Sequence, residues 1–84
     1  MATVVVYTSA HCAYCERAKA LLTRKNIAFE EIRIDLDDKR RQEMMERSGR
    51  RTVPQIFINN ESIGGSDDLY ALDANGQLDA LLAK

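Results

Sequence analysis

Apolar residues recur along this chain in two alternating patterns. Short apolar runs and the segment after the Asn59-Asn60 turn predict strands, at residues 3–7, 27–34, 55–59 and 61–64. Apolar residues at helical spacing predict helices, at residues 15–25, 38–48, 66–74 and 78–83. The predicted order is β-α-β-α-β-β-α with a short final helix, which is an α/β plan.

The predicted helices begin and end at residues suited to those positions. Asp37 or Asp38 can cap the second helix, and Gly49 ends it. Ser66 is predicted as the N-cap of the third helix, with Asp67 in its first turn. A right-handed first crossover would place the N-terminus of the first helix at the carboxyl end of the first strand. Cys12 would then lie at the edge of the sheet where α/β proteins usually place their chemistry.

Length and charge limit the class of protein. Eighty-four residues suffice for one domain, residues 1–84, because a second would be too small to bury a core. Twelve Lys and Arg against thirteen Asp and Glu give a net charge of −1, which argues against a nucleic-acid or membrane-surface protein. Neither a secretory leader nor a membrane-spanning run is recognisable, so a cytoplasmic location is expected. In that reducing compartment a C-x-x-C pair is expected to be catalytic or metal-binding.

The only two cysteines lie in the segment HCAYC, residues 11–15. A thiolate is the reactive form of cysteine, and the free N–H groups of a helix N-terminus stabilise it. Cys12 would lie at that helix start, whereas Cys15 would lie one turn inside and be more covered. We therefore expect Cys12 to be the attacking thiol and Cys15 the resolving thiol. Two inert core cysteines are disfavoured at such a position.

The segment could also bind a metal, and its residues His11 and Tyr14 could affect the reactive sulfur. Two Cys and one His are too few for a tetrahedral zinc site in one chain, although a cluster shared by two chains with outside thiols stays open. Protonated His11 could favour the Cys12 thiolate, but a solvated loop histidine is the favoured interpretation. Tyr14 is expected to be exposed near the sulfur, whereas Tyr7 and Tyr70 are expected to be packing residues.

Two further segments complete a pattern. TVP (52–54) precedes the third predicted strand, and GGSDD (64–68) leads into the third helix. With CAYC after the first strand, the chain resembles the glutaredoxins of the short bacterial dithiol class along its full length. The resemblance implies a thioredoxin-like fold with a four-stranded mixed sheet flanked by helices. It also implies a cis Val53–Pro54 bond, although base rates alone predict trans.

The resemblance also implies a glutathione site. In the family the residue at Val53 pairs its backbone with the cysteinyl part of glutathione, like an added strand, and the neighbouring residues form the same wall. The start of the third helix holds the γ-glutamyl end, although local evidence equally fits a plain turn and cap. The residues that the resemblance assigns to glutathione binding are Tyr14, Thr52, Val53, Pro54, Gly65, Ser66 and Asp67. Arg50 or Arg51 could reach the glycyl carboxylate, although most arginines of this stretch fit a solvated helix face balanced by Glu43 and Glu46.

The implied function is glutathione-dependent reduction of protein–glutathione mixed disulfides and of protein disulfides. Glutathione is then the co-substrate, glutathione reductase recycles it, and the protein acts as a monomer. A thioredoxin reduced by a flavoenzyme is disfavoured because the segment is CAYC and Trp is absent.

Two positions depart from the family pattern. Ala13 replaces a proline, and Ser9 replaces a lysine that supports the thiolate and glutathione binding. Family members without the proline more often hold a [2Fe–2S] cluster between two chains, with two cysteines and two glutathione thiols as ligands. A glutathione-assisted cluster dimer is therefore the alternative function.

Overall fold

A computed structural model describes residues 2–83, so the first and last positions of the predicted domain lie outside it. Its elements follow the predicted order. They are β1 Val4–Thr8, α1 Ala13–Arg24, β2 Glu30–Arg33, α2 Asp38–Ser48, β3 Gln55–Ile58, β4 Glu61–Gly64, α3 Ser66–Ala74 and α4 Gln77–Leu82. Within this range no helix is long and apolar enough to cross a membrane.

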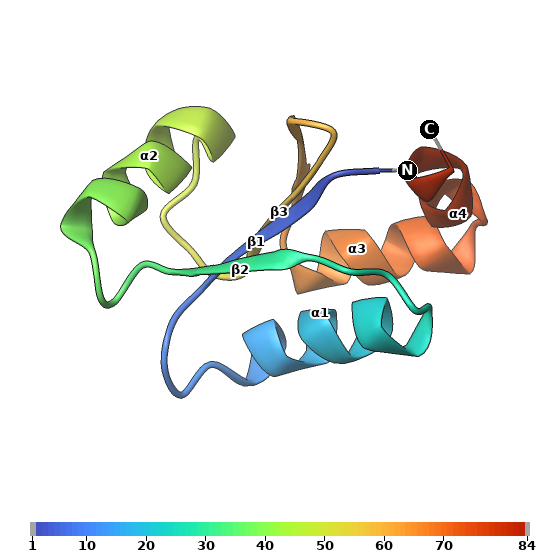
Figure 1. The fold of residues 1–84 in the computed structure, drawn as a ribbon, viewed down its shortest axis with the longest axis horizontal. Coiled ribbons are helices and arrows are strands. Elements are labelled where there is room, and N and C mark those ends of the chain that lie inside the picture. Colours follow the sequence, from blue (N-terminus) through green and yellow to red (C-terminus); the bar gives the residue numbers. More distant parts are fainter. Residues whose placement is uncertain (1, 84) are drawn as a thin grey trace.

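The strands form one mixed sheet in the order β2-β1-β3-β4. β1 and β2 are parallel, whereas β1 with β3 and β3 with β4 are antiparallel. The predicted crossover through α1 and the predicted terminal hairpin are both confirmed. α1 and α3 lie on one face of the sheet and α2 on the other (Figure 1). The carboxyl end of β1 leads through a short loop into α1, which brings the cysteine segment to this edge of the sheet.

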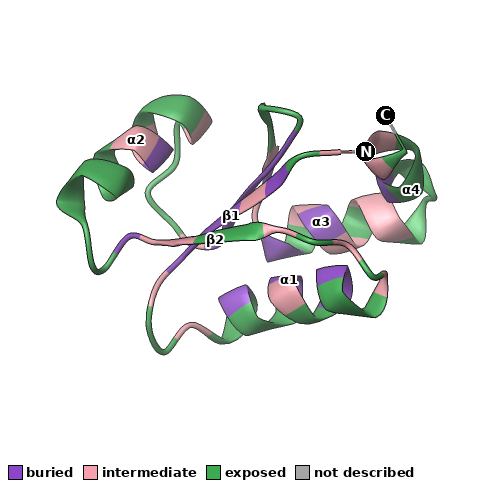
Figure 2. Ribbon diagram, viewed as in Figure 1, coloured by how far each residue is buried: buried purple, intermediate pink, exposed green. Residues whose placement is uncertain are grey.

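Alternation along β1 divides the core between the two faces. Val4 and Val6 pack with α1 and α3, whereas Tyr7 packs with Met44 of α2. α1 and α2 turn their buried residues toward the sheet and their exposed residues outward (Figure 2). Thr8, the last residue of β1, is fully buried on the α1 face. Side chains at this end of β1 therefore lie under the first turns of α1.

Tyr7 was predicted to be a packing residue, and it is one with an added polar role. Its ring meets Phe57 edge-to-face at 5.6 Å between centroids. Its hydroxyl donates to the carboxylate of Glu43 and accepts from Arg47 Nη1 at 2.7 Å. Burial and then the Glu43 carboxylate raise the pKa of Tyr7. This cluster holds α2 against its face of the sheet.

Several predicted boundaries were wrong. The second strand begins at Glu30 rather than at residue 27, because Ile27 and Phe29 pack against the α1 core without joining the strand ladder. Apolar spacing started the first helix at residue 15, but α1 begins at Ala13, with Cys12 as its N-cap as the cysteine segment predicted. α3 is capped by Gly65 rather than by Ser66, which is its first helical residue. The cap of α2 was predicted correctly as one of two residues, and the structure selects Asp37, which accepts a hydrogen bond from Lys39 N–H at 2.9 Å.

Candidate active site

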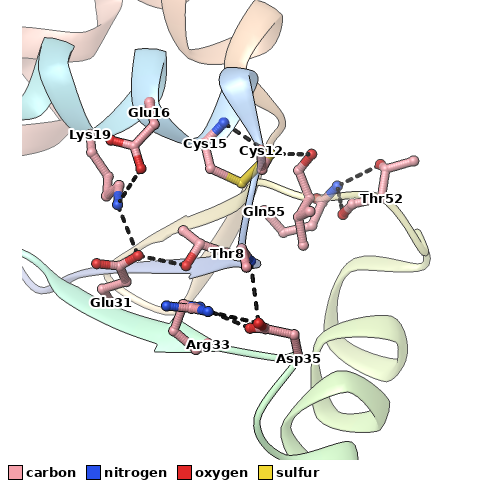
Figure 3. The surroundings of a disulfide bond; sticks show 12 residues. Thr8, Cys12, Cys15, Glu16, Lys19, Glu31, Arg33, Asp35, Thr52 and Gln55 are labelled. Atoms are coloured by element: carbon pink, nitrogen blue, oxygen red, sulfur yellow. Dashed lines mark hydrogen bonds and ion pairs between the residues drawn. A yellow bond between two sulfur atoms is a disulfide. The ribbon is translucent and has the colours of Figure 1, made fainter.

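The two cysteines lie at the N-terminus of α1 and form a disulfide (Figure 3). Cys12 is the N-cap residue, and its Sγ accepts a hydrogen bond from Cys15 N–H at 3.1 Å. Cys15 is only 1% exposed, whereas Cys12 is half-buried. An incoming sulfur therefore reaches Cys12 first. The helix donors aimed at Cys12 are also those that stabilise a thiolate after reduction.

The second wall of the site is the segment before β3. The Val53–Pro54 peptide bond is cis, as the resemblance implied and against the base rate. The Val53 carbonyl oxygen lies 3.8 Å from Cys12 Sγ, and because a disulfide sulfur has no proton this is a packing contact. Thr52 is held from inside by Gln55, whose Nε2 donates to the Thr52 carbonyl at 3.0 Å and to its hydroxyl at 3.2 Å.

Gln55 is a supporting residue that the sequence interpretation missed. It is fully buried in β3, and its amide orients the loop that carries Thr52 and Val53. Its Oε1 has no hydrogen-bond partner among residues 2–83. A polar residue at the head of the apolar run QIFI was the available signal, since buried amides normally serve a hydrogen-bonding role.

The third wall is the N-terminus of α3. Gly65 has no side chain to cap the helix, so Asp68 supplies the cap from inside and accepts Gly65 N–H at 2.9 Å. The same carboxylate oxygen pairs with Arg50 Nη1 at 3.0 Å. The Gly65 hydrogen bond and then Arg50 hold the pKa of Asp68 below its usual value. Ser66 is 4% exposed, and its hydroxyl has no partner within the described residues.

These walls enclose one open groove of about 280 Å³, and its lining residue Val53 contacts Cys12 Sγ. It contains all seven residues that the resemblance assigned to glutathione, together with Arg50 and Asp68: Tyr14, Arg50, Thr52, Val53, Pro54, Gly65, Ser66, Asp67 and Asp68. Tyr14 is 54% exposed, as predicted. Arg51 does not line this groove but lies in a neighbouring one against α2. Of the two candidate arginines, the structure therefore places only Arg50 in the groove.

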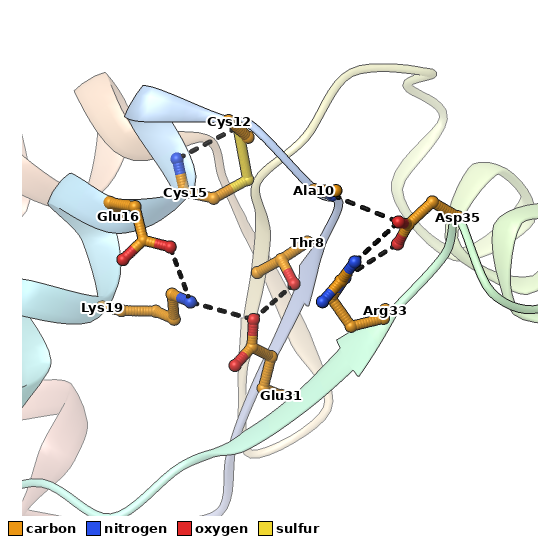
Figure 4. A network of polar contacts seen from close by, with 9 residues as sticks. All are labelled: Thr8, Ala10, Cys12, Cys15, Glu16, Lys19, Glu31, Arg33 and Asp35. Carbon is orange, nitrogen blue, oxygen red and sulfur yellow. Dashed lines mark hydrogen bonds and ion pairs between the residues drawn. A yellow bond between two sulfur atoms is a disulfide. The ribbon is translucent and has the colours of Figure 1, made fainter.

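The loop that carries Cys12 is fixed by Asp35 (Figure 4). Asp35 Oδ2 accepts Ala10 N–H at 3.3 Å, and its carboxylate pairs with Arg33 at 2.8 and 2.7 Å. Arg33 is the main reason why the pKa of Asp35 falls to about 2. His11 lies in this loop, exposed, and its side chain has no hydrogen bond within residues 2–83. The side chain that holds this loop in place is therefore Asp35, which follows β2, rather than His11.

A second polar cluster joins α1 to the sheet below the disulfide. The buried Thr8 hydroxyl donates to Glu31 Oε2 at 2.7 Å, and Lys19 Nζ lies 3.0 Å from both Glu31 and Glu16 (Figure 4). The Thr8 hydrogen bond and then Lys19 lower the pKa of Glu31. The pKa of Lys19 is raised by Glu16 and Glu31 in turn. This cluster anchors the first turns of α1 and so helps to hold both cysteines in place.

A C-x-x-C disulfide at a helix N-terminus, with one accessible sulfur beside an open groove, is the arrangement for thiol–disulfide exchange. Within the described residues no group of three or more His, Cys, Asp or Glu side chains could hold a metal ion. The fold and the site thus define a dithiol thiol–disulfide oxidoreductase.

Comparison with known proteins gives the family. The glutaredoxin family profile matches residues 4–63. Glutaredoxin 3 of Escherichia coli K12 is 60% identical over 82 residues, covering 98% of this chain and 99% of that protein. A solution structure of a Brucella melitensis glutaredoxin matches with 55% identity and a TM-score of 0.84, covering 95% and 87% of the two chains. A buckwheat glutaredoxin–glutathione complex matches with 29% identity and a TM-score of 0.90, covering 98% and 77%. The chain belongs to the glutaredoxin family, and the implied thioredoxin-like fold is confirmed.

Proposed function

We propose that this protein uses glutathione to reduce protein–glutathione mixed disulfides and protein disulfides. The observation that carries the proposal is the groove beside Cys12, which brings together residues from three separate segments. One relative of the same fold was solved as a complex with glutathione. An open groove lined by Val53, whose carbonyl oxygen contacts Cys12 Sγ at 3.8 Å, supports the same ligand here.

The walls of the groove suit the separate parts of glutathione. In the proposed complex, the backbone of Val53 pairs with the cysteinyl part like an added strand. The α3 N-terminus and the unpartnered Ser66 hydroxyl offer donors to the γ-glutamyl carboxylate, and the exposed Asp67 suits its ammonium group. Arg50 is the cation available to the glycyl carboxylate. To bind it, Arg50 would give up part of its ion pair with Asp68.

The mixed-disulfide reaction uses Cys12 alone. Its thiolate attacks the glutathione sulfur, the protein leaves as a thiolate that takes a proton, and Cys12 becomes glutathionylated. A second glutathione thiolate then attacks the bound glutathione sulfur. Oxidised glutathione leaves and the Cys12 thiolate is regenerated, so that two electrons pass from glutathione to the protein substrate.

Reduction of a protein disulfide uses both cysteines. Cys12 attacks first and forms a mixed disulfide with the substrate. Cys15 then attacks the Cys12 sulfur, which releases the reduced substrate and leaves the Cys12–Cys15 disulfide seen in the structure. The proposal includes recycling of oxidised glutathione by a separate glutathione reductase, in the cytoplasm, with the protein acting as a monomer.

The test compares electron sources. Purified protein is given a glutathionylated protein together with either glutathione and glutathione reductase or thioredoxin reductase. We expect NADPH consumption that depends on this protein only with the glutathione system. Turnover only with thioredoxin reductase, or with neither source, would refute the proposal.

A glutathione-assisted [2Fe–2S] dimer is a second candidate, and the observation that favours it is Ala13. This residue is exposed between the two cysteines, where the family proline would remove a backbone N–H. One chain offers only Cys12 as an accessible sulfur, so the cluster would need two chains and two glutathione thiols. Anaerobic reconstitution with iron, sulfide and glutathione tests this candidate, and a colourless monomer would exclude it.

A further inference from the structure

Arg17 of α1, which does not line the proposed glutathione groove, lies over the rings of Tyr14 and Tyr70. We call this arrangement the Tyr14–Arg17–Tyr70 stack. The Arg17 guanidinium carbon lies 5.7 Å from the ring centroid of Tyr14 and 5.4 Å from that of Tyr70. Tyr14 and Arg17 share one face of α1, because they are three residues apart. Tyr70 comes from α3, and its hydroxyl donates to the Arg17 carbonyl at 2.9 Å. The guanidinium is therefore held by rings from two helices.

This guanidinium is available to a partner. Arg17 is exposed and makes no ion pair with any other residue of the 2–83 range. At these distances the guanidinium is held over the rings by cation–π attraction, and its N–H groups are free to bind a carboxylate in two places. Because the rings already restrict the side chain, binding an anion would cost less side-chain entropy than for a free arginine.

The stack adjoins the place where a protein substrate must lie. Tyr14 lines the groove, and with Leu36 it is one of two strongly exposed large apolar side chains in the described chain, at 54% and 75%. A protein joined to glutathione through its cysteine must extend out of the groove over exposed residues of this kind. Tyrosine and arginine are the residues that most often anchor protein interfaces.

The charges around Arg17 decide whether a preference for acidic substrates would come from this residue or from the protein as a whole. Most carboxylates of α1 and α3 are already paired: Glu16 with Lys19, Asp68 with Arg50 and Asp73 with Lys25. Asp67 of α3 is exposed. The net charge of −1 gives the whole protein no general attraction for acidic partners. A preference for an acidic substrate would therefore have to come from Arg17 itself.

We propose that the Tyr14–Arg17–Tyr70 stack is a docking site for an Asp or Glu side chain close to the modified cysteine of a protein substrate. This inference rests on the proposed function and names a substrate class for it: glutathionylated proteins with an acidic residue beside the mixed disulfide. Tyr14 supplies the apolar contact and Arg17 the charge.

The test uses short glutathionylated peptides that differ only in having Asp, Asn or Lys near the modified cysteine. The unaltered protein should process the Asp peptide with a kcat/KM about three-fold above that of the Lys peptide, as an exposed ion pair allows, and high salt should remove the difference. Arg17→Ala should abolish the preference, and Arg17→Lys should retain part of it. Arg24→Ala is the matched control, since it removes the same charge about two turns along α1.

The outcomes separate this inference from the function on which it rests. Equal kcat/KM for all three peptides in the unaltered protein would overturn the docking site. So would an equal loss of preference in Arg17→Ala and Arg24→Ala, which would indicate a general effect of charge. If no peptide is reduced with glutathione, the proposed function itself fails. Matching thermal unfolding of the two alanine variants shows that the comparison is between folded proteins.

Discussion

Cys12 Sγ lies 3.8 Å from the carbonyl oxygen of Val53, a residue 41 positions away in the chain. This contact joins the reactive sulfur to the wall on which glutathione is proposed to bind. It exists because β1 and β3 are neighbours in the sheet, so that the loop after β1 meets the loop before β3. Each of the following predictions tests a part of this arrangement.

Replacing the two cysteines one at a time separates their roles. Cys12→Ser should remove activity toward both mixed disulfides and protein disulfides, because no other exposed sulfur can make the first attack. Cys15→Ser should retain reduction of mixed disulfides and lose reduction of protein disulfides. Steady-state rates with a glutathionylated peptide and with a protein disulfide measure this. Equal losses for both variants in both assays would contradict the assignment.

Arg50 lines both the groove that holds Thr52 and Val53 and the neighbouring groove against α2, whereas Arg51 lines only the second. Arg50→Ala should raise the KM for glutathione about three-fold, the size expected for one exposed charge contact. It should also let the pKa of Asp68 rise, since Arg50 is one of the groups that lower it. Arg51→Ala serves as the control. A larger increase in KM for Arg51→Ala would show that the groove is wrongly assigned.

Ser66→Ala should have opposite effects on stability and binding. The buried Ser66 hydroxyl has no partner among the described residues, so its loss should leave the free energy of unfolding unchanged or raise it slightly. If the hydroxyl binds the γ-glutamyl end, the KM for glutathione should increase. Urea unfolding and initial rates measure the two effects. A variant that loses stability and keeps its KM would argue for a structural role instead.

Gly64 and Gly49 both have positive φ values, +116° and +73°, but differ in their surroundings. A Cβ at Gly64 would collide with the Asp68 side chain, whereas a Cβ at Gly49 would meet open space. We expect Gly64→Ala to lower the free energy of unfolding by roughly 1–3 kcal/mol and to disturb the Asp68 cap. Gly49→Ala should cost about 1 kcal/mol from backbone strain alone. Similar losses, with an unchanged glutathione KM in both, would contradict this reasoning.

Glu31→Gln should change how stability depends on pH. The pKa of Glu31 is lowered from 4.5 in the folded protein, so its ionised form stabilises the fold above that pH. The stabilisation is lost as the pH falls through the lower, folded-state pKa. The unaltered protein should therefore exceed Glu31→Gln by about 1 kcal/mol near neutral pH, a modest value because the ion pair is partly exposed, and the gap should close in acid. Glu30→Gln is the matched control, since Glu30 is an exposed neighbour with no ion pair among the described residues.

Much of the site could be predicted because the two cysteines lie in one short segment, CAYC. Helical spacing after CAYC placed Cys12 at the start of α1 and Cys15 inside it, and burial confirms that order. The exact cap of α3 could not be predicted, because Gly65 and Ser66 both suit the position. The choice depends on Asp68, whose carboxylate is held by the distant Arg50.

The sequence alone determined the order of the elements, the asymmetry between Cys12 and Cys15 and the family resemblance. These depend on apolar periodicity and capping, which act between residues a few positions apart. Only the tertiary structure decided that Arg50 rather than Arg51 lines the groove, that Gln55 supports the Val53 loop, and that Arg17 lies over the rings of Tyr14 and Tyr70. Such contacts join segments far apart in the chain, and the packing of helices onto the sheet selects them.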